Sequence, residues 1–311
     1  MESARHVLIR YHEIALKGRN RSMFVDRLVG NIRRATVGMH VASVWSERMG
    51  VHVDLEPQAD WSQIRDRVST VFGAVKLALA YETEPNETAI TSKLIHLARE
   101  IHFGTFRITT NRSDKRFPLT SQQLNIRLGE LVQKETKSKV NLQVPDVNFR
   151  IEIGTRKAYI YTQDVLGAGG LPVGTAGRVS VLMSGGIDSP VAAWRLMRRG
   201  CHASLVHFHS FPLVEGRSRE KAKDLARILN NYQYDTKLYL VPFAEIQKNV
   251  ILSVPGPLRV VAYRRFMIRI AEKIGLRDGS KALVTGESVG QVGSQTLQNI
   301  ATVGQAANMP L

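Results

Sequence analysis

The chain has 311 residues, which at about 100–200 residues per domain predicts two or three domains. A hydrophobic content of 43% and a charged content of 23% exclude wholesale disorder and a collagen-like chain. The single cysteine, Cys201, excludes an intramolecular disulfide and fits a reducing compartment. The net charge of +16, spread along the chain, favours a polyanionic partner, nucleic acid first, over a basic surface that is only solvated.

Neither end of the chain has the pattern of a targeting or membrane segment. The first 20 residues carry charges throughout and lack the apolar core of a signal peptide. The longest uncharged stretch, residues 288–311, holds six amide side chains that a bilayer would not accept unpaired. We therefore expect a cytoplasmic protein without a membrane contact.

The first 58 residues are predicted to form a small α+β domain. Residues 4–10 predict a strand, and residues 22–36 place apolar side chains at helical spacing, with Ser22 as the N-cap. Residues 41–56 predict two short strands around a polar turn. Strand, helix and two strands in this order indicate a small α+β sandwich.

Residues 59–165 predict a second α+β domain. Its expected elements are helices over 60–71, 88–103 and 120–134, a strand over 105–110 and a hairpin-like pair of strands over 148–161. Residues 72–81 show a mixed pattern. The glycine-rich residues 166–177 then predict a linker.

Residues 178–311 change to short apolar runs that alternate with helical patterns. The expected elements are strands over 179–183, 203–208, 237–241 and 281–285, and helices over 190–199, 218–230 and 258–274. This alternation predicts a parallel sheet with right-handed crossovers. The final residues, ANMPL, look like the start of an element, so we expect this domain to be cut short.

The segment SGGIDSP, residues 184–190, lies where the first of these strands gives way to a helix. Two adjacent glycines let the backbone approach an anion, and the free N–H groups and dipole of the helix attract phosphate. Asp188 beside a phosphate would bind Mg²⁺ or orient hydrogen-bond donors. The segment is neither a GK[ST] loop nor GxGxxG. It resembles the pyrophosphatase loop of enzymes that split ATP into pyrophosphate and an adenylated intermediate; the alternative is an Asp-capped helix after a glycine turn.

Three further segments extend the resemblance: PLTSQQLN (118–125), YRRFM (263–267) and LVTGESVGQVGSQTLQN (283–299). With residues 165–201, they make the chain resemble the tRNA 4-thiouridine synthetases, or tRNA sulfurtransferases, over almost its whole length. The resemblance implies an α+β and α/β multidomain protein. Residues 1–58 would form a ferredoxin-like domain, residues 59–165 a THUMP RNA-binding domain and residues 178–311 a pyrophosphatase-loop catalytic domain.

The resemblance also implies a two-step reaction and its participants. ATP adenylates uridine 8 of tRNA with release of pyrophosphate, and a persulfide sulfur then displaces AMP to give 4-thiouridine. The family further supplies sulfur for the thiazole of thiamine. The expected partners are therefore tRNA and a persulfide donor such as a cysteine desulfurase.

The site residues are expected from the same resemblance. Ser184 and Asp188 would be catalytic, and Mg²⁺ would accompany ATP without a dedicated set of metal ligands. The expected ATP contacts are Leu182, Met183, Gly185, Gly186, Ser189, His207, Phe208, Arg264, Gly286 and Gln295. These lie at or near the carboxyl ends of parallel strands, where such sheets bind ligands. Without the resemblance, His207 would be a packed strand-end histidine and Arg264 part of a solvated helix face.

The second step needs a nucleophilic sulfur, which family members carry on a cysteine later in the catalytic domain or on an added rhodanese domain. This chain ends before both. We expect Cys201 to be a small buried hydrophobe; in the catalytic alternative, Arg198, Arg199 and His202 would lower its thiol pKa. Sulfur would then come from an outside carrier, from sulfide, or from a missing end of the chain.

Basic side chains of the THUMP-like segment are the expected RNA contacts: Arg107, Arg112, Lys115, Arg116 and Arg127. Aromatic residues make up only 7% of the chain, so base stacking is not the expected mode. Salt-sensitive recognition of folded RNA through its phosphates is expected instead. The alternative is that these charges keep a helix face soluble. A dimer that binds one tRNA across two subunits is left open.

Two other functions remain. A pyrophosphatase-loop enzyme acting on a small molecule, such as an amidating synthetase, would not need the +16 charge or the N-terminal half. A catalytically silent RNA-binding protein would not need SGGIDSP together with TGE and the amide-rich tail. Pyrophosphate release from ATP in the presence of unmodified tRNA separates these alternatives.

Overall fold

The structure of the protein is a computed structural model that describes residues 4–47, 50–210, 217–291, 293 and 295–311. The chain forms two compact units. The first unit contains the chain up to Tyr11, Thr36–Ser69 and Val75–Gly167, and the second contains His12–Ala35, Thr70–Ala74 and Ala168–Leu311. Residues 12–35 thus cluster with the third expected domain, and the boundaries at 58, 165 and 177 stay a prediction.

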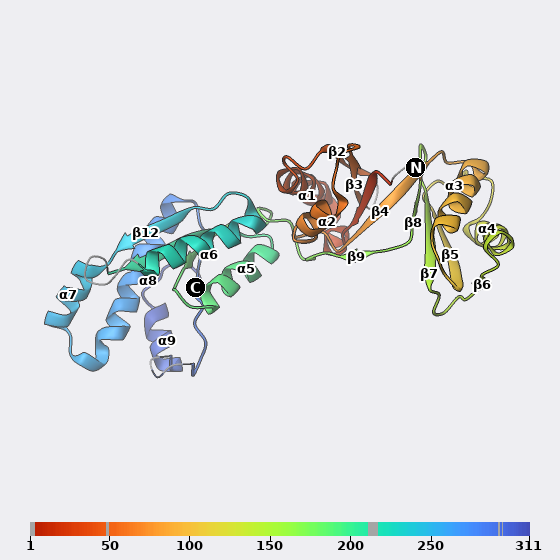
Figure 1. The fold of residues 1–311 in the computed structure, drawn as a ribbon. Helices are drawn as coiled ribbons and strands as arrows, with labels where there is room; N and C mark the ends of the chain where they lie inside the picture. The colour runs from red at the N-terminus through yellow and green to blue at the C-terminus, as the bar shows by residue number, and fades with distance from the viewer. Residues whose placement is uncertain (1–3, 48–49, 211–216, 292, 294) are drawn as a thin grey trace. The chain divides into compact units, whose positions relative to one another are not determined.

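Among the described residues of the first unit, nine strands join in one sheet (Figure 1). Their order is β2-β3-β1-β4-β8-β7-β5-β6, and β9 pairs with β4 outside this path. The strands are β1 (His6–Arg10), β2 (Val41–Glu47), β3 (Gly50–Leu55), β4 (Lys76–Thr83), β5 (Thr105–Arg112), β6 (Lys139–Val140), β7 (Val147–Ile153), β8 (Ala158–Tyr161) and β9 (Val165–Leu166). The turn expected between β2 and β3, residues 48–49, lies outside the described residues.

Strand β4 joins the two groups of strands that the sequence assigned to separate domains. Its residues 76–80 pair with β1, and its residues 81–83 pair with β8, both antiparallel. The segment that showed a mixed pattern is therefore a strand for most of its length. One strand of eight residues makes the sheet continuous.

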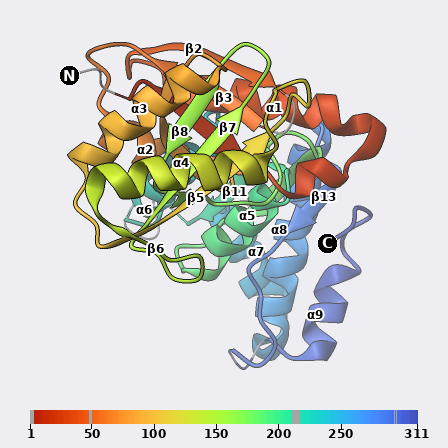
Figure 2. The same cartoon turned by 90° about the vertical axis from the view of Figure 1, so that its right-hand side faces the viewer.

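Two helices cover the β5–β7–β8 part of this sheet (Figures 1 and 2). The Asn86 side chain accepts the Ala89 N–H at 2.8 Å and so begins α3, while Thr120 and Gln123 form a capping box at α4. Phe106 and Phe149 are fully buried beneath the two helices. The helices of this unit are α2 (Trp61–Ser69), α3 (Glu87–Glu100) and α4 (Ser121–Thr136).

The second unit contains four described strands, all parallel, in the order β12-β11-β10-β13. Strand β10 has β11 and β12 on one side and β13 on the other, so the strand order reverses at β10. The carboxyl ends of β10 and β13 therefore border a crevice. The strands are β10 (Arg178–Leu182), β11 (His202–His209), β12 (Leu238–Pro242) and β13 (Ala282–Val284). The helices are α1 (Arg21–Ala35), α5 (Asp188–Arg198), α6 (Arg217–Gln233), α7 (Ala244–Ser253), α8 (Arg259–Arg277) and α9 (Leu297–Gly304).

Helices cover both faces of the parallel sheet, as its continuous apolar strands predict. Val181 and Leu205 pack with residues of α5 and α6, whereas Val206 packs on the other face with residues of α8 and α9. Helices α8 and α9 lie side by side (Figures 1 and 2), and the Arg265 guanidinium donates to the Thr302 carbonyl. The ATP-binding residues expected on α8 and near α9 therefore share one face of the sheet.

Local structure differs from the sequence predictions at several places. Helix α1 begins at Arg21, directly after a 3-10 turn over Gly18–Asn20, so Ser22 lies inside the helix and its assignment as N-cap is wrong. Helices α7 and α9 were not predicted.

None of the described helices combines the length and the apolar character that crossing a membrane requires.

The glycine-rich stretch that we expected as a linker packs into the second unit. Leu171 and Val173 are buried, and the Asn31 amide donates to the Val173 carbonyl at 3.2 Å. Gly170 has a φ of +75°, and a Cβ there would lie 2.3 Å from the Arg198 carbonyl oxygen. Glycine is required here by a left-handed backbone and by a close approach.

The last residues of the chain are held against α8 and β13. The N–H groups of Asn308 and Met309 donate to one carboxylate oxygen of Glu272 at 2.7 and 2.6 Å. The Leu283 N–H donates to the Pro310 carbonyl at 2.8 Å. These bonds fix the last residues beside α8 and β13.

Candidate functional site

A cavity of about 480 Å³ lies at the carboxyl ends of the parallel strands. The loop after β10, the end of β11 and the segment after β13 all contribute to its wall. Eleven of the twelve residues expected at the ATP site line it: Leu182, Met183, Ser184, Gly185, Asp188, Ser189, His207, Phe208, Arg264, Gly286 and Gln295. Gly186 does not line the cavity but belongs to the same loop.

Two serine hydroxyls hold the loop between β10 and α5. The Ser189 hydroxyl accepts the Ser184 N–H at 3.0 Å and lies 3.1 Å from the Ser184 hydroxyl. The Ser184 hydroxyl also accepts the Gly186 N–H at 3.2 Å. Helix α5 begins at Asp188, and no side chain caps its N-terminus. Its first N–H groups are therefore available to an anion in the loop.

The loop glycines and Gly286 are glycine for different reasons. A Cβ on Gly185 would come no closer than 3.7 Å to the described protein atoms, and one on Gly186 no closer than 3.4 Å. A Cβ on Gly286 would lie 2.5 Å from the Ser189 nitrogen and 2.7 Å from the Asp188 carbonyl carbon. Packing against α5 thus requires Gly286, whereas the protein itself leaves room for side chains at the two loop positions.

Two buried polar atoms in the cavity wall lack a hydrogen-bond partner among the described residues. The His207 ring approaches the Met183 carbonyl through Nδ1 at 2.9 Å, which leaves Nε2 unpartnered. The Gln295 side-chain oxygen is likewise unpartnered. Because buried polar groups normally pair, these atoms are suited to bind the polar edge of a ligand.

The charged groups of the wall are paired within the protein. The Arg264 Nε lies 3.4 Å from a carboxylate oxygen of Glu287, and the Gln291 amide donates to Asp188 at 3.0 Å. Arg265 points elsewhere, toward the Thr302 carbonyl on α9. Adjacent helical positions separate the two arginines, so only Arg264 faces the cavity.

Six lining residues were missed by sequence reasoning: Ser218, Met267, Ile268, Thr285, Glu287 and Val303. Helical spacing from Arg264 could have found Met267 and Ile268, because residues three and four apart share a face. Thr285 and Glu287 flank Gly286 in the TGE segment that was singled out. Val303 had no signal, since α9 itself was not predicted.

Cys201 belongs to the apolar core beneath α5 and α6, as expected for a small buried hydrophobe. Burial raises the pKa of its thiol. In the catalytic alternative neighbouring cations would lower this pKa, but Arg199 pairs with Glu13 at 2.8 Å and Arg198 lies over the Trp194 ring.

The basic residues expected to bind RNA mostly have partners within the protein. Arg127 pairs with Glu87 at 2.7 Å, and Arg116 pairs with Asp114 at 2.8 Å. Arg112 donates to the Phe117 carbonyl and Arg107 to the Leu142 carbonyl, each at 3.0 Å. Lys115 is exposed, and no ion pair to it occurs within the described ranges. The five residues therefore do not form one patch of unpaired charge.

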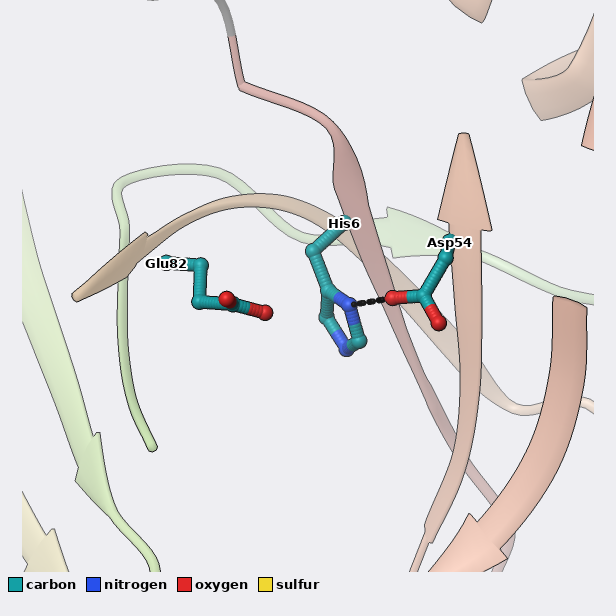
Figure 3. A group of neighbouring side chains, drawn as sticks. All are labelled: His6, Asp54 and Glu82. Atoms are coloured by element: carbon teal, nitrogen blue, oxygen red, sulfur yellow. Dashed lines mark hydrogen bonds and ion pairs between the residues drawn. The ribbon is translucent and has the colours of Figure 1, made fainter. Parts of the chain in front are cut away.

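Among the described residues of the first unit, one group has metal-ligand chemistry: His6, Asp54 and Glu82 (Figure 3). Their possible ligand atoms lie within 4.8 Å of one another. However, His6 Nδ1 bonds to Asp54 at 2.8 Å, and His6 Nε2 lies 2.9 Å from Nδ1 of His52. Glu82 pairs with Lys157.

Further hydrogen bonds belong to this network. Asp54 also accepts from the Ser43 hydroxyl at 2.5 Å and the Trp45 ring at 3.2 Å, and the bond from His6 foremost holds its pKa well below the usual range. Burial, followed by the His6 and Arg10 charges, lowers the pKa of His52 to about 3. The group is a satisfied hydrogen-bond network in the sheet.

Three protein families match the chain in succession. The ThiI ferredoxin-like domain matches residues 6–78, the THUMP domain residues 84–163 and the family described as thiamine biosynthesis protein (ThiI) residues 174–311. A probable tRNA sulfurtransferase of Thermus thermophilus is 45% identical over 97% of this chain and 74% of its own length. Another, from a Thermoanaerobacter species, is 38% identical over 98% of this chain and 80% of its own length.

Solved structures give the same comparison for the fold. A 4-thiouridine synthetase in complex with RNA and bound ATP matches with a TM-score of 0.88 and 31% identity, over 99% of this chain and 80% of that one. The protein PH1313 of Pyrococcus horikoshii matches with a TM-score of 0.79 and 25% identity, over 98% of this chain and 92% of that one. The match to the 4-thiouridine synthetase spans all three domains that the family models find in this chain, and the last of them holds the parallel sheet.

Proposed function

Because the chain belongs to the tRNA sulfurtransferase family, we propose that it uses ATP to activate uridine 8 of tRNA and then replaces the activated oxygen by sulfur. In the first step the uridine 4-oxygen bonds to the α-phosphorus of ATP, and pyrophosphate leaves. In the second step the outer sulfur of a persulfide attacks carbon 4, and AMP leaves with the former uridine oxygen. A second thiol then attacks the carrier sulfur and breaks its bond to the transferred sulfur, which leaves a disulfide on the donor side. The product is 4-thiouridine.

The observation that carries this proposal is the form of the cavity after β10. Two loop positions have room that glycine leaves open, and the N-terminus of α5 adds free N–H groups, so a polyphosphate fits there. His207 Nε2 and the Gln295 oxygen provide buried polar atoms for a nucleobase edge. The likeness to a synthetase solved with bound ATP supports the same assignment.

Distinct roles follow for the residues of the site. The N–H groups of Gly185 and Ser189 would bind phosphate, and the Ser184 hydroxyl would keep the loop closed through its bonds to Ser189 and to the Gly186 N–H. Asp188 would manage Mg²⁺, since a carboxylate oxygen is a ligand that Mg²⁺ prefers. Arg264 would stabilise charge on the phosphates after exchanging its contact with Glu287.

The strand ends and Gly286 complete the proposed nucleotide site. Leu182, Met183 and Phe208 would bound the nucleobase, and Phe208 is itself supported by the ring of Phe243 at 5.5 Å. Gly286 would act through packing, because it sets the distance between the segment after β13 and the start of α5. A bulkier residue there would move the phosphate loop.

Pyrophosphate release tests the proposal. We expect release with ATP and unmodified tRNA, and none with ATP and free amino acids or nitrogen donors. Asp188→Asn should abolish release, whereas the matched control Asp224→Asn, on the exposed face of α6, should leave it unchanged. Binding of tRNA without ATP turnover in the unmodified protein would instead indicate a silent RNA-binding protein.

The sulfur must reach this site from a group other than Cys201. The thiol is buried in the core and its pKa is raised, so it is a poor nucleophile. We propose an outside persulfide carrier such as a cysteine desulfurase, and sulfide as a substitute in vitro. Cys201→Ser should therefore leave thiolation of a tRNA transcript with sulfide unchanged. A loss of thiolation with normal pyrophosphate release would show that Cys201 takes part in sulfur transfer.

Supply of sulfur for thiamine synthesis, a dimer that shares one tRNA, and a cytoplasmic location are further parts of the proposal. The match of residues 174–311 to a family described by thiamine biosynthesis supports the first. Sedimentation of the protein with and without tRNA would test the second.

A further inference from the structure

The nucleotide cavity has too little positive charge for the ligand proposed for it. Among the lining residues that the structure describes, the charged side chains are Asp188, Arg264 and Glu287. Arg264 is paired with Glu287, so the wall as a whole is acidic. ATP brings several negative charges to this place, and its tight binding calls for a further cation beside the loop.

Lys221 on α6 lies in the right place to provide this cation. A Cβ on Gly185 would be 3.7 Å from Cδ of Lys221, so the lysine side chain runs alongside the phosphate loop. Ser218 lines the cavity, and Lys221 follows it by three residues on the same face of the helix. Two separate observations therefore direct this side chain toward the loop.

The charge of Lys221 is also free to act. Lys221 is exposed, and within the described part of the chain its amine has no ion pair. By contrast, Lys223, two residues later, pairs with Glu220 at 2.8 Å. The same helix thus offers one lysine beside the loop and one engaged elsewhere.

We propose that Lys221 binds the phosphates of ATP that lie against Gly185. This inference rests on the proposed function. As the uridine oxygen bonds to the α-phosphorus, the bond from that phosphorus to the bridging oxygen breaks, and its electron pair stays on the leaving pyrophosphate. The Lys221 ammonium then neutralises charge that grows on this group, and so it assists the step as well as the binding.

The test compares Lys221→Met with the matched control Lys223→Met. Calorimetric titration with ATP should show about 10–100-fold weaker binding for Lys221→Met, the range of one lost charge-assisted contact. Adenosine should bind both variants like the unmodified protein, because it lacks phosphate. Lys221→Arg should restore most of the ATP affinity, and pyrophosphate release at saturating ATP should be slower in Lys221→Met.

Three results would overturn the assignment. If the two methionine variants bind ATP equally well and pyrophosphate release still depends on Asp188, Lys221 does not bind the phosphates, and the proposed function is unaffected. Equal losses for ATP and adenosine mean that Lys221 only supports the fold of the cavity. No ATP binding by the unmodified protein overturns the proposed function, and the inference with it.

Discussion

Gly286 provides the sharpest test of how the site is built. A Cβ at this position would lie 2.5 Å from the Ser189 nitrogen and 2.7 Å from the Asp188 carbonyl carbon. Ordinary contacts between such atoms are about 3.5 Å or longer, so Gly286→Ala must push the start of α5 away by about 1 Å. Overpacking of this kind costs about 1–3 kcal/mol of folding free energy.

Two measurements should respond. At about 2–4 °C for each kcal/mol, the melting temperature of Gly286→Ala should fall by about 2–12 °C. A displacement of about 1 Å in the groups that bind phosphate should slow pyrophosphate release about 100-fold. Thermal melting and a coupled pyrophosphate assay on the same preparation give both values.

Gly185→Ala is the matched control, because its Cβ would meet no described protein atom closer than 3.7 Å. Its free energy of unfolding should change by no more than a surface substitution does, about 0.5 kcal/mol. Its ATP affinity should nevertheless fall about tenfold, since the methyl group takes space meant for phosphate. A Gly286→Ala protein that melts and reacts normally, or a Gly185→Ala protein that binds ATP normally, would refute the reasoning.

Three further predictions concern the rest of the molecule. The folded state holds the pKa of His52 at about 3, so between about pH 6.5 and 3 only the unfolded chain binds this proton. As the pH is lowered through this range, the free energy of unfolding should decrease by up to about 1.4 kcal/mol per pH unit. Denaturant titrations at about pH 7 and 5 should show a smaller decrease for His52→Gln than for the unmodified protein, and an equal decrease contradicts the assignment. Burial opposes ionisation of Asp278, but hydrogen bonds, that from Lys237 foremost, lower its pKa to about 2. Asp278→Asn should therefore lower the free energy of unfolding at pH 7 by about 2–3 kcal/mol, measured by chemical denaturation. An unchanged free energy of unfolding would show that the network is dispensable. Lys115→Ala should weaken tRNA binding and reduce its salt slope by about 1 in filter-binding titrations, whereas Arg127→Ala, which loses an internally paired charge, should change the slope less; the reverse order would contradict the structure.

The sequence predicted best those features that depend on local pattern. The continuous apolar run before SGGIDSP is strand β10, and Pro190 lies in the first turn of α5 as expected. The alternation of strands and helices after residue 178 gave the parallel sheet. In each case neighbouring residues carry the signal, so one stretch of sequence is sufficient.

Pairings between distant residues could not be predicted in this way. Nothing in the residues of β4 indicates that its second half pairs with β8, some 75 residues later, because strand pairing depends on the whole sheet. The ion pair of Arg127 with Glu87 is likewise invisible to a count of basic residues. Helix α7 was missed because Phe243 before it provides no side-chain cap.

The continuity of the nine-stranded sheet bears on how this protein can be divided. A cut after residue 58 would leave β1 without its neighbour β4, and would strip β4 of half its ladder. Each fragment would then present a bare strand edge, which invites association with other chains. Strands β1 to β9 should therefore stay on one chain in any division of the protein, and because residues 12–35 between them belong to the second unit, that unit loses α1 in a cut after β9.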